Sequence, residues 1–295
     1  MKRKTSQIST IFYFLFFFVL STSFAQVVSK TNDYFNLKNR LKFGNYLFCQ
    51  QDYLRAIDEF NAVNKKIKND TLDFKIGYAF EKMRKYDKAI EKFSELNGNK
   101  NLSGLSRLET GKIFLLKKEF PEVYKLLIDS IEYKNNLRQY AGRLKYLTYL
   151  YDNKPLPDSS NYKLWFSSKV LPDVMKFYRR KQNPHYKSET LSGVLSAIIP
   201  GLGKIYVGEI GDGITALLFN GVLGFLAYNN FKANHKFRAW LFTGLTAVFY
   251  GGNIYGSVAA AQIYNSGVNF RFTRELNLFS KKHNYFLPKF KFLCE

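Results

Sequence analysis

The residue types that usually perform catalysis are few and scattered in this sequence. The three histidines, His185, His235 and His283, lie in separate segments, so a metal site would need the fold to gather them. No metal-ligand, phosphate-loop or nucleophile motif occurs. Four polar residues interrupt apolar stretches and are the remaining candidates: Asp212, Asn220, Tyr250 and Asn253. Because they form no evident nucleophile–base pair, we predict a protein that is not an enzyme and needs no cofactor or metal, an unrecognised site among these four being the alternative.

Cysteine and charge give two further indications. Cys49 and Cys294 are too few for a disulfide framework, and we expect Cys49 to pack as a small apolar residue. The formal net charge of +22 is compatible with nucleic-acid binding or with attraction to anionic lipid headgroups. The lipid interpretation is favoured because apolar segments accompany the charge, and no nucleic acid is expected.

Two long stretches, Gly213–Tyr228 and Ala239–Tyr264, contain no charged side chain. Each approaches or exceeds the roughly 17–25 apolar residues that span a bilayer. The segment between them, from Asn229 to Arg238, is polar and basic. This pattern predicts a transmembrane helical hairpin with a cytoplasmic loop.

The first 25 residues are typical of a secretory signal peptide. Three basic residues precede the apolar run Ile11–Leu20, and Ser23-Phe24-Ala25 forms a small-x-small cleavage site. An uncleaved N-terminal anchor is the alternative. In both cases the region that follows is expected to be exported.

An internal repeat follows the signal peptide. Three glycines, Gly44, Gly77 and Gly111, are spaced by 33 and 34 residues, and three further columns align with them. These columns are Tyr53, Tyr86 and Phe120; Ala56, Ala89 and Val123; and Phe60, Phe93 and Leu127. The third unit departs from the pattern because Val123 replaces a small residue.

The repeat resembles the tetratricopeptide family, whose period is about 34 residues. The resemblance implies helical hairpins, with a glycine where two helices cross and a small residue inside the second helix. It implies an α-solenoid over residues 26–151 and a concave surface for an unidentified protein partner, a simple spacer being the alternative. Residues 152–189 are expected to form capping and linker helices, with a break near Pro172.

The segment that opens the hairpin resembles the TM2-type bacterial membrane domain. The matching positions are Ser192 and Ser196, the turn Pro200-Gly201-Leu202-Gly203, the step Tyr206-Val207-Gly208, and Gly213. The resemblance covers residues 190–265 and implies a location and a fold but no reaction. Residues 266–295 are left as a basic, aromatic tail, either disordered or lying on the membrane surface or the solenoid.

Each motif residue has a mechanical reason. Pro200 should end a short helix from Leu191 to Ile199, because proline lacks an amide donor. Gly201 and Gly203 can adopt backbone angles closed to other residues. Tyr206 should lie at the lipid–water boundary, and Asp212 should cap the first span. The expected result is a re-entrant or interfacial element.

Small residues recur every four positions on both spans. Gly252, Gly256 and Ala260 form one stripe, and Ala216, Asn220 and Gly224 form the other. We predict that the stripes face each other, with Asn220 and Asn253 hydrogen-bonded in the interior. Homodimerisation is the alternative use of the same stripes.

Together these patterns predict an all-α protein: a TPR-like α-solenoid followed by a transmembrane helical hairpin. We expect a non-enzymatic scaffold in the bacterial inner membrane, with the solenoid in the periplasm, which binds a protein partner and contacts membrane lipids. The alternative is that the hairpin is the active part and assists membrane-protein insertion or binds lipid.

Overall fold

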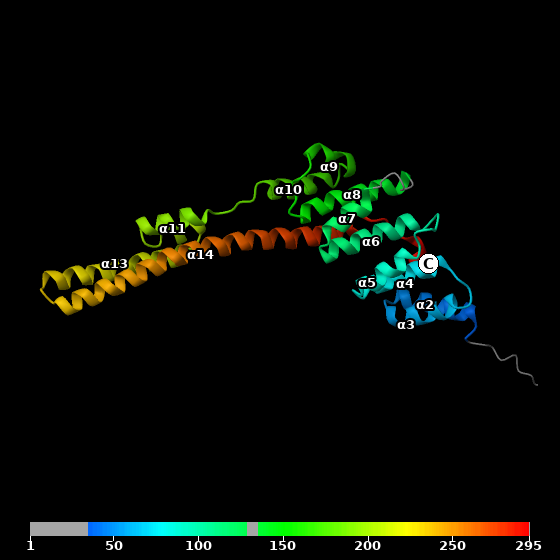
Figure 1. The fold of residues 1–295 in the computed structure, drawn as a ribbon, viewed down its shortest axis with the longest axis horizontal. Coiled ribbons are helices and arrows are strands. Elements are labelled where there is room, and N and C mark those ends of the chain that lie inside the picture. Colours follow the sequence, from blue (N-terminus) through cyan, green and yellow to red (C-terminus); the bar gives the residue numbers. More distant parts are fainter. Residues whose placement is uncertain (1–34, 129–134, 295) are drawn as a thin grey trace, which may run out of the picture. The chain divides into compact units, whose positions relative to one another are not determined.

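The computed structural model describes residues 35–128 and 135–294, and the predicted signal peptide lies outside these ranges. Every regular element in them is a helix and none is a strand, which confirms the all-α class (Figure 1). The chain divides into two compact units, one formed by residues up to Lys92 with Lys291–Glu295, the other by Phe93–Phe290. The boundary between the two units, after Lys92, therefore lies inside residues 26–151, the segment predicted as one solenoid.

The first unit is built from paired helices that begin at side-chain caps. Asn36, Asp52 and Asn69 each accept a backbone N–H from the first turn of the helix that follows, as residues of these types commonly do. The helices are α2 (Leu37–Cys49), α3 (Tyr53–Asn64), α4 (Asp70–Lys82) and α5 (Tyr86–Ser94), whose last two residues belong to the second unit. Leu47, Phe48 and Phe60 are central to their apolar core, and the short η3 (Lys291–Leu293) adds the partly buried Leu293.

The two cysteines, expected to be too few for a disulfide framework, form a single disulfide in the first unit. Cys49 ends α2 and Cys294 follows η3, with their Cα atoms 5.6 Å apart. The cysteine count excludes a framework of several bridges, but it does not exclude a single bridge between distant residues. The expectation that Cys49 packs only as a small apolar residue was therefore wrong.

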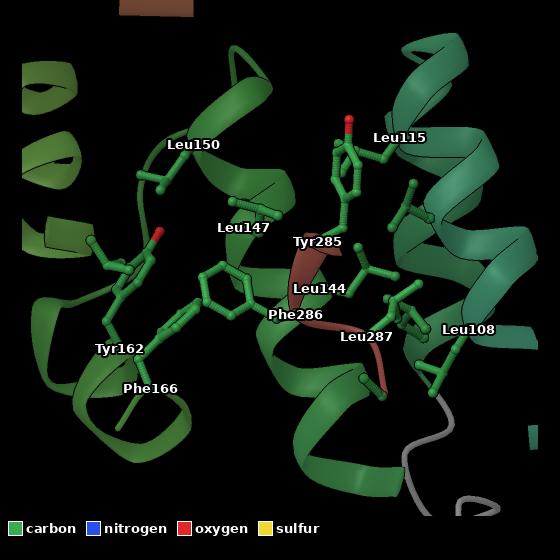
Figure 2. Packing of buried hydrophobic residues seen from close by; sticks show 14 of the residues in the cluster. Leu108, Leu115, Leu144, Leu147, Leu150, Tyr162, Phe166, Tyr285, Phe286 and Leu287 are labelled. Atoms are coloured by element: carbon green, nitrogen blue, oxygen red, sulfur yellow. The ribbon is translucent and has the colours of Figure 1, made fainter. Parts of the chain in front are cut away.

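The second unit contains a large helical core. Its first helices are α6 (Ser103–Lys117), α7 (Phe120–Ile128), α8 (Asn135–Tyr151), α9 (Ser159–Trp165) and α10 (Leu171–Gln182). Leu144 and Leu147 of α8 are fully buried at its centre, and Tyr285 and Phe286 enter the same core from the chain's C-terminal part (Figure 2). The break expected near Pro172 is present, since this proline occupies the first turn of α10.

The remainder of the second unit is one very long helix with shorter ones beside it. These are α11 (Glu189–Ile198), α12 (Leu202–Val207), α13 (Ile210–Lys232), α14 (Lys236–Lys282) and η2 (Asn284–Phe286). At 47 residues, α14 is about 70 Å long. Among the described helices, α13 alone is both long and apolar enough to cross a membrane.

The structure differs from the sequence prediction at both ends of α14. The loop expected from Asn229 to Arg238 is a turn of three residues between helices that end at Lys232 and begin at Lys236. The tail expected from residue 266 is helical to Lys282. Charged residues such as Arg271 mark the end of an apolar stretch, but they do not end a helix, because they form helices readily.

The repeat columns occupy equivalent places in three helix pairs. The glycines lie within α2, α4 and α6, and the aromatic residues are the first residues of α3, α5 and α7. Ala56, Ala89 and Val123 are fully buried. A Cβ on Gly44 would lie only 2.8 Å from the Phe60 ring, so this glycine allows two helices to pack closely.

Candidate functional site: a buried polar seam

Residues of the predicted membrane motif gather where α11 and α12 pack on α14. Ser192 and Ser196 of α11 and Ser257 of α14 are fully buried there. We call these three serines, with Gly203 and Asn253, the polar seam. All of its residues belong to the second unit.

The seam is a chain of hydrogen bonds. The Gly203 N–H donates to Ser196 Oγ over 3.0 Å, and the hydroxyl oxygens of Ser196 and Ser257 are 2.6 Å apart. Ser257 Oγ donates to the Asn253 carbonyl over 2.8 Å. Ser192 Oγ reaches the carbonyl oxygens of Gly203, at 3.0 Å, and of Ser257, at 2.8 Å. Three helices are thereby joined by hydroxyls that are buried from solvent.

Two glycines make this close packing feasible. Gly201 has a φ of +86°, and a Cβ there would overlap the backbone of Gly213 in α13. Gly203 has an ordinary φ, but a Cβ there would overlap the Ser192 carbonyl oxygen. Pro200 lies just beyond the end of α11 at Ile198, as predicted.

Tyr206 and Gly208 complete the short α12. The Tyr206 hydroxyl accepts the backbone N–H of Ser188 at 3.2 Å, and Lys187 Nζ lies 4.6 Å from the ring centre. Gly208 ends α12 with a φ of +101°. Tyr206 therefore fastens the start of α11 to α12.

Asp212 does not cap α13. The residue at the N-cap position is Glu209, which makes no side-chain capping bond, and Asp212 lies in the first helical turn. A carboxylate in that turn still interacts favourably with the helix dipole. The predicted cap, Asp212, lies three residues after the actual N-cap position, Glu209, because the helix begins at Ile210.

Asn220 and Asn253 are buried, being 7% and 6% exposed, but they do not bond to each other. Asn220 Nδ2 donates to the Ala216 carbonyl of its own helix at 2.8 Å. Asn253 Nδ2 approaches the Ser196 carbonyl at 3.5 Å. Within the described chain, neither Oδ1 atom has a hydrogen-bond partner.

The small-residue stripe predicted on α14 is out of phase by one residue. The buried positions are Asn253, Ser257 and Ala261, whereas Gly252 is exposed and a Cβ there would meet nothing within 4 Å. A Cβ on Gly256 would meet the Lys204 side chain at 3.5 Å, an ordinary contact. A shift of one residue rotates the face by about 100°.

The predicted partner stripe on α13 is only partly buried. Gly213, Asn220, Leu223 and Ala227 are the buried residues of this helix. Gly224 instead lines an open groove of about 480 Å³ between α13 and α14, together with Thr243 and Gly251. The two small-residue stripes therefore do not form the predicted contact.

Sequence reasoning missed that the inward face of α14 continues beyond the seam. The Asn265 side chain pairs with the backbone of Lys187, accepting from its N–H at 2.8 Å and donating to its carbonyl at 2.9 Å. Farther along, Glu275 pairs with Arg180, and Ser280 accepts from the Tyr151 hydroxyl at 2.9 Å. The four-residue spacing of positions 253, 257, 261, 265 and 269 was the available signal.

The outer faces of this part of the second unit are apolar. Large hydrophobic side chains are exposed on α11, on the part of α13 outside its buried face, and along α14. They include Leu191, Val194 and Ile198; Ile214, Leu218, Val222, Phe225 and Tyr228; and Phe237, Trp240, Leu245, Val248, Tyr255 and Ile263.

The chemistry available at the seam is hydrogen bonding by neutral groups. In the described ranges, no three His, Cys, Asp or Glu side chains are grouped so that they could hold a metal ion. His185, His235 and His283 lie before α11, before α14 and at the end of α14. The seam consequently joins helices tightly while the surrounding surface stays apolar.

No protein-family model matches the chain, and the search of curated proteins finds none that is similar. The function is therefore argued from the geometry.

Proposed function

We propose that this chain is a non-enzymatic, membrane-anchored scaffold of the bacterial cell envelope. In this proposal α11 to α13 and the first half of α14 are embedded in the inner membrane, and the helix pairs form a TPR-like solenoid in the periplasm that recruits a protein partner. The observation that supports it most is the exposed apolar surface around α13.

A bilayer is the environment that suits this surface. Soluble monomers rarely expose large contiguous apolar patches. At 23 residues, α13 is about 35 Å long, enough for a hydrocarbon core of about 30 Å. The amide in the middle of the helix is turned inward: Asn220 is 7% exposed, whereas Phe225 is 61% exposed.

The packing of the second unit requires any crossing by α13 to be reversed. The same core contains Leu144 and Val174, which precede α13, and Leu276 and Phe286, which follow it. Residues of one core lie on one side of a membrane, so the first half of α14 must return across it. This argument supports a two-span hairpin, although α14 is less apolar than α13.

The disulfide supports export. Disulfides persist in oxidising compartments such as the bacterial periplasm and are rare in the cytosol. Cys49 and Cys294 lie on opposite sides of the hairpin in sequence, so their bridge also requires an even number of crossings between them. The basic residues Lys232, Lys236 and Arg238 at the α13–α14 turn would then face the cytoplasm, as positive residues in short loops usually do.

The helix pairs support the recruiting role. Their repeat glycines, leading aromatic residues and buried small residues occupy equivalent positions in α2 to α7. Stacked helical pairs provide an extended concave surface that suits a peptide or a partner helix. A spacer would have the same fold, so capture of a specific partner is the distinguishing property.

The test is protease accessibility in intact spheroplasts and in lysed ones, followed by alkaline extraction of the membranes. We expect digestion of the helix pairs in intact spheroplasts and a protected fragment containing α13 and the first half of α14 that resists extraction. Protection of the helix pairs until lysis would reverse the topology. Complete extraction of the full chain would rule out the membrane anchor.

A further inference from the structure

The second unit contains a second feature of interest, a cavity of about 760 Å³. It opens between the end of α8, the end of α10 with the segment that follows, and α14. Phe120, Tyr264 and Phe272 supply aromatic walls, while Asn269 and Thr273 supply polar groups. The cavity lies beyond the polar seam along α14.

The charge of this cavity has one sign. Four basic residues, Lys118, Arg180, Lys181 and Arg271, line it together with His185, and burial lowers the pKa of the Lys181 amine to about 8. No aspartate or glutamate is among the lining residues within the described chain. An anion would therefore find several cations and no repelling carboxylate in the wall.

Two of the cations are already engaged by the protein. The Lys181 amine donates to the carbonyl oxygens of Tyr149 and Leu150, at 2.8 and 3.1 Å, and so caps the end of α8. Arg180 forms an ion pair with Glu275, whose carboxylate lies outside the wall. These two residues form part of the cavity wall, but the Glu275 carboxylate balances the charge of Arg180 and Asp152 lies near Lys181.

The other two cations remain for a ligand. Lys118 at the end of α6 and Arg271 on α14 form no ion pair with any residue in the described ranges. Both are exposed, and they approach the cavity from different helices. Guanidinium and ammonium groups at one cavity are the usual partners of a phosphate group.

The place of the cavity on α14 indicates where such a phosphate would come from. Between Arg238 and Arg271, α14 carries no charged residue over positions 239–270. This length of helix is about 48 Å, close to the roughly 40–45 Å of a bilayer with its headgroups. If the hairpin crosses the membrane as proposed above, the cavity lies at the level of the lipid headgroups.

We propose that this cavity binds a phosphate ester, with Lys118 and Arg271 as its ligating cations, and that the headgroup of an anionic phospholipid supplies it. The assignment of the phosphate to a lipid rests on the proposed membrane anchor. The assignment of the cavity to a phosphate rests on its charge alone. The two parts can therefore fail separately.

The experiment compares the full-length protein with two double variants. K118Q/R271Q removes both free cations, and K169Q/R274Q is the control, because it removes equal charge from exposed positions that do not line the cavity. Retention of phosphatidylglycerol is measured by native mass spectrometry from neutral detergent micelles doped with that lipid. Binding of soluble sn-glycerol 1-phosphate is measured in parallel by calorimetry.

The expected result is retention of phosphatidylglycerol that K118Q/R271Q weakens about tenfold, as loss of charge-assisted hydrogen bonds predicts, while the control retains it. Binding of glycerol phosphate alone, lost in the same variant, would support the cavity and exclude the lipid as its source. Equal binding by both double variants, or binding of neither probe, would overturn the proposal. Alkaline extraction of the same proteins reports on the membrane anchor independently.

Discussion

At the residue scale, the decisive feature is the missing Cβ where α12 meets α11. Gly203 donates its N–H to Ser196 and lies against the Ser192 carbonyl, so any side chain there would separate the two helices. Displacement would also withdraw the donor on which the Ser196 hydroxyl depends. A buried polar group that loses its partner costs about 1–3 kcal/mol.

We therefore expect Gly203→Ala to destabilise the second unit by about 2–4 kcal/mol, since overpacking and lost hydrogen bonds act together. Gly221→Ala is the matched control, because a Cβ at that position on α13 would meet nothing within 4 Å. It should be neutral or slightly stabilising, as alanine favours a helix over glycine. Thermal unfolding in detergent measures both, and equal midpoints would contradict the seam's role.

At the element scale, α14 is the structure on which the second unit is organised. Its inward face contacts α11 through Ser257, the segment just before α11 through Asn265, α10 through Glu275 and α8 through Ser280. A single continuous helix thus connects the apolar helices to the folded core. The Asn265 pair with Lys187 is the link nearest the middle of α14.

Asn265→Ala should loosen this link without unfolding either end of α14. Two hydrogen bonds to the Lys187 backbone are lost, at about 1 kcal/mol each. We expect faster amide hydrogen exchange at residues 185–189 and unchanged exchange in α8. The exposed neighbour Ser266→Ala is the control and should change neither. Unchanged exchange at 185–189 in both variants would show that the Asn265 pair does not hold this segment.

At the scale of the whole molecule, the core of the second unit is rich in buried tyrosines. Tyr162 is fully buried, Tyr124 is 8% exposed, and Tyr151 is partly buried beside Ser280. Burial raises the pKa of all three phenols above 10, because the charged form is poorly solvated there. The pKa of each phenol is therefore higher in the folded state than in the unfolded state.

This raised pKa predicts loss of stability in alkali. Below pH 10 both states hold the phenolic protons, whereas above pH 10 the unfolded chain releases them and the folded core does not. At pH 11 the loss is at most about 1.4 kcal/mol per tyrosine. We expect the unfolding midpoint, followed by tryptophan fluorescence, to fall above pH 10. Tyr162→Phe, whose hydroxyl has no partner within the described chain, should flatten the decline. An identical decline in this variant would contradict the assignment.

The disulfide joins two parts of the described chain that are far apart in sequence. It joins residues separated by 245 positions, so the chain-entropy relation gives a stabilisation of about 5.5 kcal/mol. Cys294→Ser should lower the unfolding midpoint of the first unit and expose the last residues to carboxypeptidase. Wild-type protein treated with reductant should behave in the same way. Free thiols in wild-type protein isolated without reductant, detected with a maleimide, would contradict the bridge.

Much of the helical framework could be predicted from the sequence. The 33- and 34-residue spacing placed three helix pairs correctly, because small and aromatic residues recur wherever two helices must pack closely. α11 ends at Ile198, just before Pro200, as expected because proline has no amide donor to continue a helix. The burial of Asn220 and Asn253 could be predicted too, since amides in apolar helices turn away from an apolar exterior.

Three features were decided only by the tertiary structure. The inward face of α14 contains Ser257 rather than Gly256, because hydrogen bonding to α11 selects the serine, and small size alone does not distinguish the two positions. α14 continues past the apolar stretch, because its end packs in the core through Leu276. Cys49 meets Cys294, because the chain returns to the first unit after completing the second, and no local pattern records that return.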